Sequence, residues 1–299
     1  MLTYASSNDL NLNNVVNLFG IDKDLPFTIT KGKLSLNSNI SGVLNKSYNL
    51  KSDINIKDLS IKDRQYNIPV LANSVNINFT GNDKKYSGNV ICNNVLASYK
   101  NRKISSTEFK VLFDENKISI PENILSSPNS LRVSGILNNY RNKPIGQINL
   151  QGNILASELA EFLKPDVKLP YKAQGKINTT GNIQFQGEVV NIRANLKANE
   201  NNYISYMVIN ELFKKPSFVN LDCSLTGETV NIKDFSLNEE NANKNRKIIG
   251  INGELLLGKE AYLKNLRVNI PESLTVATNF FGGEEISLKA NLLLNKEIK

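Results

Sequence analysis

Residues 75–83 read Val-Asn-Ile-Asn-Phe-Thr-Gly-Asn-Asp. Val75, Ile77 and Phe79 alternate with polar residues, and this alternation predicts a β-strand with one apolar and one polar face. The Thr-Gly-Asn-Asp segment that follows consists of residues that tolerate tight turns. An alternating stretch that ends in such a segment is typical of a β-hairpin.

The same alternation recurs from about residue 27 almost to the end of the chain. The chain has 299 residues, of which 40% are hydrophobic, so it is long enough to form one long or two ordinary domains. We therefore expect an all-β fold, a twisted antiparallel sheet with only a few short helices.

Helical periodicity is confined to three short segments, at about residues 13–19, 157–163 and 206–213. Asn13 is a candidate N-cap for the first, and Gly20 is suited to end it. Ser157 is the candidate N-cap of the second, which Pro165 stops. The third segment ends before Pro216.

The first two helical segments belong to an internal repeat. A shift of 144 residues aligns several helix and loop positions without a gap, namely Asn13 with Ser157, Leu18 with Phe162, Pro26 with Pro170 and Phe27 with Tyr171. After deletion of one residue, Gly32-Lys33-Leu34 aligns with Gly175-Lys176-Ile177. We predict two repeats, residues 1–145 and 146–299, each with a short helix followed by strands, in one continuous sheet.

The composition excludes much catalytic chemistry. The chain has 47 asparagines but no histidine and no tryptophan. Without histidine it has no Ser-His-Asp triad and no His-ligated zinc. No glycine belongs to a phosphate-binding loop between a strand and a helix. We therefore expect no cofactor, no metal and no enzymatic activity.

The charged residues and the cysteines give no sign of nucleic-acid or metal binding. The net charge of +8 comes from basic residues that are scattered singly, whereas nucleic-acid binding favours a basic stripe interleaved with aromatics. Cys92 and Cys223 lie far apart, each in an apolar stretch. We interpret them as buried free thiols.

No stretch approaches the 18 or so apolar residues of a membrane helix, and residues 1–18 do not have the pattern of a secretory leader. We expect either a cytoplasmic protein or an internal piece of a longer chain whose anchor lies upstream.

Two segments, Asp9 to Gly42 and Leu131 to Gly187, share the same order of sequence features. A strand leads into a short helix and a Leu-Pro step, and then into Gly-x-aliphatic-x-aliphatic strands that end at a glycine turn. In this order of features the chain resembles the AsmA-like superfamily, which includes the AsmA, YhdP and TamB-type proteins of diderm bacteria. It differs from them in having no N-terminal transmembrane anchor and no recognisable TamB-type C-terminal region.

The resemblance implies an elongated sheet folded lengthwise into an open groove, a β-taco, and a non-enzymatic periplasmic bridge tethered to the inner membrane by anchors outside this segment. Such a bridge carries phospholipid acyl chains between the inner and outer membranes, in outer-membrane biogenesis, with an outer-membrane protein as a further partner. The alternating aliphatics are the candidate lipid-groove residues: Leu34, Leu36, Ile54, Ile56, Ile77, Phe79, Val111, Phe113, Val133, Ile148, Leu150, Ile183, Phe185, Ile192, Leu221, Leu225, Ile251, Leu255, Leu257, Val268, Ile270, Ile286, Leu288 and Leu292.

Periodicity alone leaves other classes open. The same aliphatics fit the dry core of a β-sandwich surface protein, and the repeated turns fit an Asn-rich β-solenoid or adhesin. Adjacent carboxylates at Glu239-Glu240 and Glu284-Glu285 are the only candidates for acid–base catalysis, and we interpret them as solvated charges. Lys84-Lys85 and Lys214-Lys215 are either plain loop lysines or contacts for anionic headgroups.

Overall fold

A computed structural model describes residues 2–18, 20, 23, 25–43, 47–64, 67–99, 102–126, 130–158, 171–198, 202–206, 217–240, 245–257, 261–277 and 285–298. Within these ranges the chain separates into two compact units, Met1–Arg141 (unit 1) and Asn142–Lys299 (unit 2). Both units consist almost entirely of antiparallel β-strands, as the alternation predicts.

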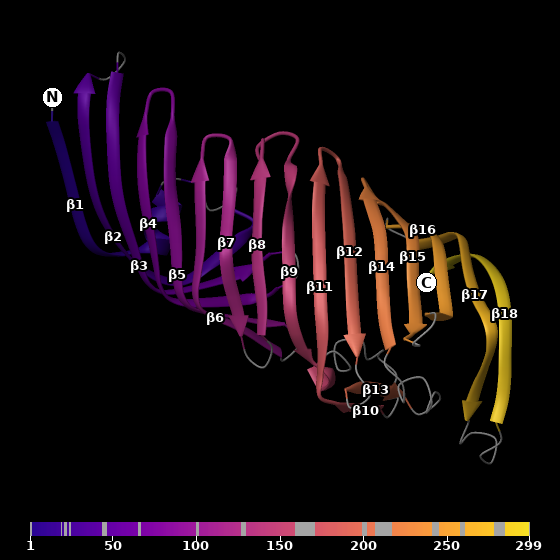
Figure 1. The fold of residues 1–299 in the computed structure, drawn as a ribbon. Helices are drawn as coiled ribbons and strands as arrows, with labels where there is room; N and C mark the ends of the chain where they lie inside the picture. Colours follow the sequence, from indigo (N-terminus) through magenta and orange to yellow (C-terminus); the bar gives the residue numbers. More distant parts are fainter. Residues whose placement is uncertain are drawn as a thin grey trace. The chain divides into compact units, whose positions relative to one another are not determined.

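Unit 1 contains one helix and a sheet in which each strand pairs with the next one in sequence (Figure 1). Its elements are β1 (Leu2–Asn11), α1 (Leu12–Leu18), β2 (Phe27–Val43), β3 (Ser47–Asp63), β4 (Pro69–Asn82), β5 (Tyr86–Tyr99), β6 (Arg102–Asp114), β7 (Lys117–Ser126) and β8 (Ser130–Asn138). All of these pairings are antiparallel.

Unit 2 repeats this plan in a sheet with the order β9-β11-β12-β14-β15-β16-β17-β18 and a separate pair, β10 with β13. The strands are β9 (Ile145–Leu155), β10 (Tyr171–Gln174), β11 (Lys176–Gln186), β12 (Val189–Ala198), β13 (Tyr203–Tyr206), β14 (Ser217–Thr226), β15 (Thr229–Glu239), β16 (Arg246–Leu256), β17 (Ala261–Ala277) and β18 (Glu285–Ile298). These pairings are antiparallel as well.

The long strands of unit 1 bend in their middle (Figure 1). Asp58 in β3 and Asn94 in β5 have φ angles of 51° and 50°, in the left-handed region that Asp and Asn tolerate better than most residues. In β2 the register shifts on either side of Lys31. A bulge adds an unpaired residue and increases the local twist, so the strand turns there without ending. Part of the Asp and Asn content that predicts turns therefore lies inside strands.

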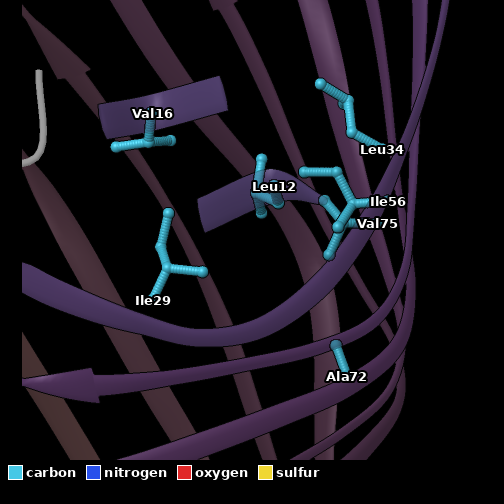
Figure 2. Packing of buried hydrophobic residues seen from close by; sticks show 7 residues of the cluster. All are labelled: Leu12, Val16, Ile29, Leu34, Ile56, Ala72 and Val75. Carbon is cyan, nitrogen blue, oxygen red and sulfur yellow. The ribbon is translucent and has the colours of Figure 1, made fainter. Parts of the chain in front are cut away.

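The bend wraps the sheet around α1. Leu12 and Val16 of the helix form one buried cluster with Ile29 and Ala72 from one side of the bulges and with three residues from the other side, Leu34, Ile56 and Val75 (Figure 2). The face that carries this cluster is therefore the inside of the fold, and we call it the inner face. The opposite face is the outer face.

The start of α1 differs from the prediction. The Asn11 side-chain oxygen accepts hydrogen bonds from the amides of Asn13 and Asn14, at 3.0 and 3.2 Å, so Asn11 and not Asn13 is the N-cap. The helix begins one residue earlier because Asn11, the last residue of β1, reaches the free amides of the first turn. Gly20, with a φ of 67°, follows the helix as expected.

The second predicted helix lies mostly outside the described residues. Residues 156–158 are helical, and the Ala156 amide donates a 2.9 Å hydrogen bond to the Gly175 carbonyl. Ser157 therefore lies within the helix and is not its cap, because β9 runs directly into the first turn. Of the third predicted helix, Tyr206 is the last residue of β13 and the rest lies outside the described ranges.

The two helix starts occupy the same position in the strand register. Leu10 pairs with Leu34 in unit 1, and Ile154 pairs with Ile177 in unit 2, which are the positions that the repeat alignment relates. No helix in the part of the chain that the structure describes is long and apolar enough to cross a membrane.

Candidate functional site: two apolar inner faces

The inner face of unit 1 carries continuous apolar rows that cross the strands. One row runs from Leu34 through Ile56, Val75 and Cys92 to Phe109, because each residue lies directly opposite the next across a strand pair. A parallel row contains Leu36, Ile54, Ile77, Val90 and Val111. Directly opposed residues point to the same side of a sheet, so the rows form one surface.

All nine groove candidates of unit 1 lie on this inner face. They are Leu34, Leu36, Ile54, Ile56, Ile77, Phe79, Val111, Phe113 and Val133. Val133 follows from the pairing of Phe113 with Ile118 and of Ile118 with Leu137, since Val133 and Leu137 are four residues apart in a regular strand. The period of two thus places the candidates together, although their role in binding lipid stays a prediction.

Among the residues that the structure describes, α1 covers one end of the inner face of unit 1. Leu34, Ile56 and Val75 are buried in the cluster that α1 completes, so the protein itself occupies the space beside them. Val90 and Val111 are only half-buried, and Ile104 on the inner face of β6 is 51% exposed. The main contacts of β5–β8 are with their neighbours in the sheet. The uncovered part of the face therefore lies beyond α1.

The inner face of unit 2 is built the same way. Ile148 lies opposite Ile183, which lies opposite Ile192, and Leu221 continues through Phe235 and Ile251 to Val268 and Leu292. The candidates on this face are Ile148, Leu150, Ile183, Phe185, Ile192, Leu221, Leu225, Ile251, Leu255, Val268, Ile270 and Leu292. Leu257 follows the end of β16 and is exposed. The side chains of Ile286 and Leu288 lie outside the described residues.

The outer faces carry pairs of asparagines that join neighbouring strands. Asn78 donates a hydrogen bond to Asn89 at 3.1 Å, Asn182 to Asn149 at 2.8 Å, and Asn195 to Asn220 at 2.7 Å. Each pair joins neighbouring strands. The asparagine content therefore serves cross-strand pairing on the outer surface as well as turns.

An aromatic cluster ends the inner face of unit 1 at the hairpin turns. The Phe79 ring stacks on Tyr86 and on Phe113, with centroids 5.9 and 6.4 Å apart. The Tyr86 hydroxyl lies 2.8 Å from that of Tyr140, and the Arg141 guanidinium lies 5.0 Å from the Tyr86 ring centroid and hydrogen-bonds to its hydroxyl. The bond to Tyr140 is the main cause that raises the pKa of Tyr86. Sequence reasoning missed this cluster because Tyr86 and Arg141 are 55 residues apart.

A polar cavity of about 640 Å³ lies at the same hairpin end of the sheet. Most of its lining residues, such as Lys51, Thr80 and Ser87, are on the outer face, because they alternate with inner-face residues in β3–β5. Tyr86 and Lys85 of the β4–β5 turn also line it. Lys84 and Lys85 are exposed in the β4–β5 turn, where the Asn82 side chain accepts both of their amide hydrogens. Lys214 and Lys215 lie outside the described residues.

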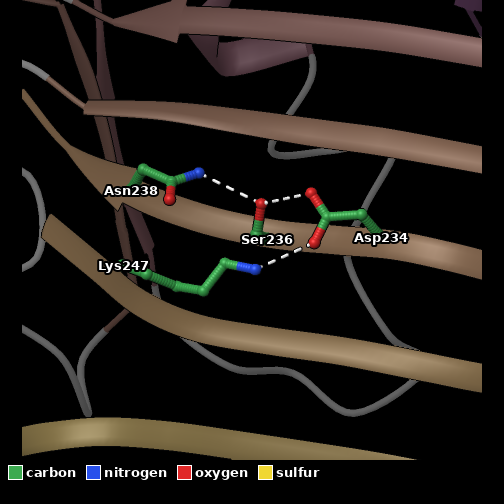
Figure 3. Close-up of polar contacts among 4 residues, drawn as sticks. All are labelled: Asp234, Ser236, Asn238 and Lys247. Carbon is green, nitrogen blue, oxygen red and sulfur yellow. Dashed lines mark hydrogen bonds and ion pairs between the residues drawn. The ribbon is translucent and has the colours of Figure 1, made fainter. Parts of the chain in front are cut away.

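The polar groups of unit 2 that look catalytic are paired or inaccessible. Ser236 donates to Asp234 at 2.9 Å, Asn238 donates to Ser236, and Lys247 binds Asp234 at 3.0 Å (Figure 3). Ser236 is only 1% exposed, so its hydroxyl is not accessible to a substrate. This network stabilises the sheet and offers no nucleophile.

The carboxylate pair at Glu239-Glu240 is divided between the two faces of the sheet. Glu239, at the end of β15, lies 3.5 Å from Arg246, whereas Glu240 lies 2.8 Å from Lys197. Glu239 is also buried, which corrects the view of it as a solvated loop charge. Glu284 lies outside the described residues, as does the Glu285 side chain. No group of acidic or cysteine side chains in the described ranges could hold a metal ion.

The two cysteines lie on the inner faces, one in each unit. Cys92 is half-buried beside Val75, and Cys223 is buried in the row of Ile192. Burial raises the pKa of both thiols. Cys223 fits a buried free thiol, and Cys92 is less enclosed than expected.

Comparison with known proteins gives no identity. The chain matches no family model, no curated protein and no solved structure. The resemblance to AsmA-like proteins stays a hypothesis, and function has to be argued from the geometry of the inner faces.

Proposed function

We propose that the chain is a non-enzymatic lipid-binding segment whose inner faces hold phospholipid acyl chains. The observation that carries this proposal is the half-buried apolar inner surface of β6–β8, which continues the buried cluster beneath α1. Apolar surface in water is unfavourable by about 25 cal/mol per Å². An acyl chain would remove this surface from water without requiring any hydrogen bond.

The shape of the apolar surface favours a long flexible ligand over a compact one. The row from Leu36 to Val111, whose members are only half-buried, extends over five strands. Neighbouring strands are about 4.8 Å apart, so this row spans roughly 19 Å, comparable to an extended acyl chain of about 16 carbons. A small rigid ligand would cover only part of such a row.

The alternative classes receive less support. A β-solenoid stacks parallel strands, whereas every pairing in the described ranges is antiparallel between strands that follow each other closely in sequence. A β-sandwich core would bury both halves of the inner face as completely as α1 buries Leu34. Half-buried Val111 and exposed Ile104 do not fit that arrangement.

The cellular setting is proposed on the resemblance alone. An AsmA-like protein would work in the periplasm, tethered to the inner membrane by segments outside this one, and would move phospholipid towards the outer membrane. Repetition of the same inner face in both units supports a role in transfer, because a conduit needs successive binding positions of the same chemistry.

Two adjacent residues of β6 provide a matched test. Val111 faces inward in the apolar row, and Leu112 faces outward opposite Asn89. We expect Val111→Asp to abolish bound phospholipid in native mass spectrometry, because an ionised carboxylate in an apolar groove is strongly disfavoured. Leu112→Asp should leave the lipid in place.

Thermal unfolding measured on the same samples separates lipid binding from core packing. If Val111→Asp unfolds the protein while Leu112→Asp does not, the inner face is a closed core and the proposal is wrong. Purified wild-type protein that carries no lipid and binds none from phosphatidylglycerol micelles contradicts the proposal directly.

Cys92 gives a second readout without a substitution. Because burial raises its pKa, the thiolate that reacts with maleimide forms only at higher pH than for a free cysteine, so labelling should be measured near pH 9. A bound acyl chain beside Phe109, which lies opposite Cys92, should slow labelling of Cys92. Equal rates with and without phospholipid would argue against an occupied inner face.

A further inference from the structure

The hairpin end of the inner face of unit 1 has the chemistry of a headgroup site. We propose that Tyr86, Tyr140 and Arg141 bind the phosphate of a phospholipid whose acyl chain lies along the row of Val90 and Val111. This inference rests on the proposed function and adds the chemical class of the headgroup, a phosphate that carries a negative charge.

The guanidinium is held in place by a directed chain of hydrogen bonds. The Tyr140 hydroxyl donates to the Asp114 carbonyl at 3.2 Å, so its oxygen accepts from the Tyr86 hydroxyl at 2.8 Å. The Tyr86 oxygen in turn accepts from Arg141. Each tyrosine hydroxyl has a single hydrogen. Because Tyr140 donates its hydrogen to the Asp114 carbonyl, Tyr86 must donate to Tyr140, and Arg141 donates to Tyr86. Hydrogen bonds in such a chain strengthen one another.

Arg141 retains free donors for a ligand. A guanidinium has five N–H groups, and its fork geometry matches phosphate oxygens. In the part of the chain that the structure describes, Arg141 makes no ion pair with a carboxylate, and its bonds are to tyrosine hydroxyls. It also stacks over Tyr86 and Tyr140, with ring-centroid distances of 5.0 and 5.7 Å, which orients its plane. An oriented cation with unused donors is suited to an anion.

The aromatic rings connect this cation to the apolar rows. Phe113 lies over Gly88, where an added Cβ would overlap the ring, and Gly88 lies two residues before Val90 on the same face. Phe79 and Tyr86 stack beside Phe113. Moving along the inner face, the surface therefore changes from aliphatic to aromatic to cationic, which is the order of groups along a phospholipid.

The test compares ligands that share an acyl chain and differ in the phosphate. Dihexanoyl phosphatidylglycerol, dihexanoylglycerol and inorganic phosphate are each titrated into the full chain by calorimetry. We expect Arg141→Gln to weaken phosphatidylglycerol binding about tenfold or more, since charge-assisted hydrogen bonds to phosphate are lost. Binding of dihexanoylglycerol should not change. Arg141→Lys should recover only part of the loss, because an ammonium lacks the planar fork.

Arg132→Gln is the matched control, because Arg132 is exposed on the outer face of β8. It should bind both lipids like the wild type. Unchanged phosphatidylglycerol binding by Arg141→Gln, with the wild type binding both lipids, overturns the headgroup site and leaves the groove standing. Binding of neither lipid to the wild type overturns the groove and the site together. Inorganic phosphate bound as tightly as phosphatidylglycerol would assign Arg141 to a free anion and also overturn the proposal.

Discussion

Units 1 and 2 differ by one residue at the bend in the stretch of strand that follows the helix. In unit 1, β2 continues from Phe27 to Val43 through a bulge at Lys31. In unit 2, the corresponding stretch is one residue shorter and breaks at Gly175, whose φ is 76°, into β10 and β11. An extra residue lets a strand bend while its hydrogen bonds continue, and without it the chain needs a left-handed glycine.

The buried clusters at these two bends also differ. Among the described residues, the buried cluster around Leu12 in unit 1 contains seven hydrophobic residues, and the cluster around Ala156 in unit 2 contains Ala156, Ile177 and Ala198. Leu12 and Ala156 are equivalent in the repeat, as are Leu34 and Ile177. A continuous bent sheet thus encloses a large helix side chain, and a broken one closes over an alanine.

The largest effect on stability is expected for Leu12→Ala, which removes the central side chain of the unit 1 cluster. Removal of this buried side chain leaves a cavity that the bent sheet cannot collapse, and we expect a loss of about 3 kcal/mol in the free energy of unfolding. Urea denaturation followed by circular dichroism measures it. Leu18→Ala in the same helix is the control, since Leu18 is 82% exposed and should change stability by less than about 0.5 kcal/mol. Equal losses of unfolding free energy in the two variants would show that the burial of Leu12 does not contribute to stability.

The reverse exchange, Ala156→Leu, tests whether unit 2 has room for the larger residue. Ala156 is 0% exposed, and we expect overpacking to destabilise the protein by about 2 kcal/mol. Ser157→Leu places the same side chain at the exposed neighbouring position and should cost much less. A stable Ala156→Leu protein would mean that the two clusters are interchangeable.

Gly175→Ala probes the break itself. A Cβ there would overlap the Asn202 side chain, and the positive φ strains any L side chain, so a loss of about 1–2 kcal/mol is expected in thermal unfolding. Gly181→Ala is the matched control, because its Cβ would meet Leu150 at an ordinary 3.5 Å. If Gly175→Ala and Gly181→Ala changed thermal stability equally, the left-handed glycine would not explain the break between β10 and β11.

The smallest effect is expected at Ser236 in unit 2. Ser236→Ala removes the hydroxyl that joins Asp234 and Asn238, and leaves the buried Asn238 amide without that acceptor. The expected loss is about 1 kcal/mol, measured by urea denaturation. Ser130→Ala, at an exposed position, should be neutral. No difference between the two would show that the network adds nothing to stability.

Much of this architecture follows from local chemistry. The period of two identified the strands and assigned residues such as Val111 to one face and Leu112 to the other. The repeat alignment related Leu34 to Ile177, and its one-residue gap coincides with the bulge at Lys31. Local rules placed the start of α1 within one residue, but they chose Asn13 as its cap because Asn11 and Asn13 are the same residue type and equally suited to cap a helix.

Sequence by itself determined the strands and their faces, because these depend on neighbours a few positions apart. Tertiary structure alone decided where the sheet bends, since Asp58 and Asn94 are residue types typical of turns but lie inside strands, because the adjacent strands continue past them. It also decided that α1 covers one end of the inner face, and that Arg141 stacks on Tyr86. These contacts join residues tens of positions apart, and their energies depend on the register of every strand between them.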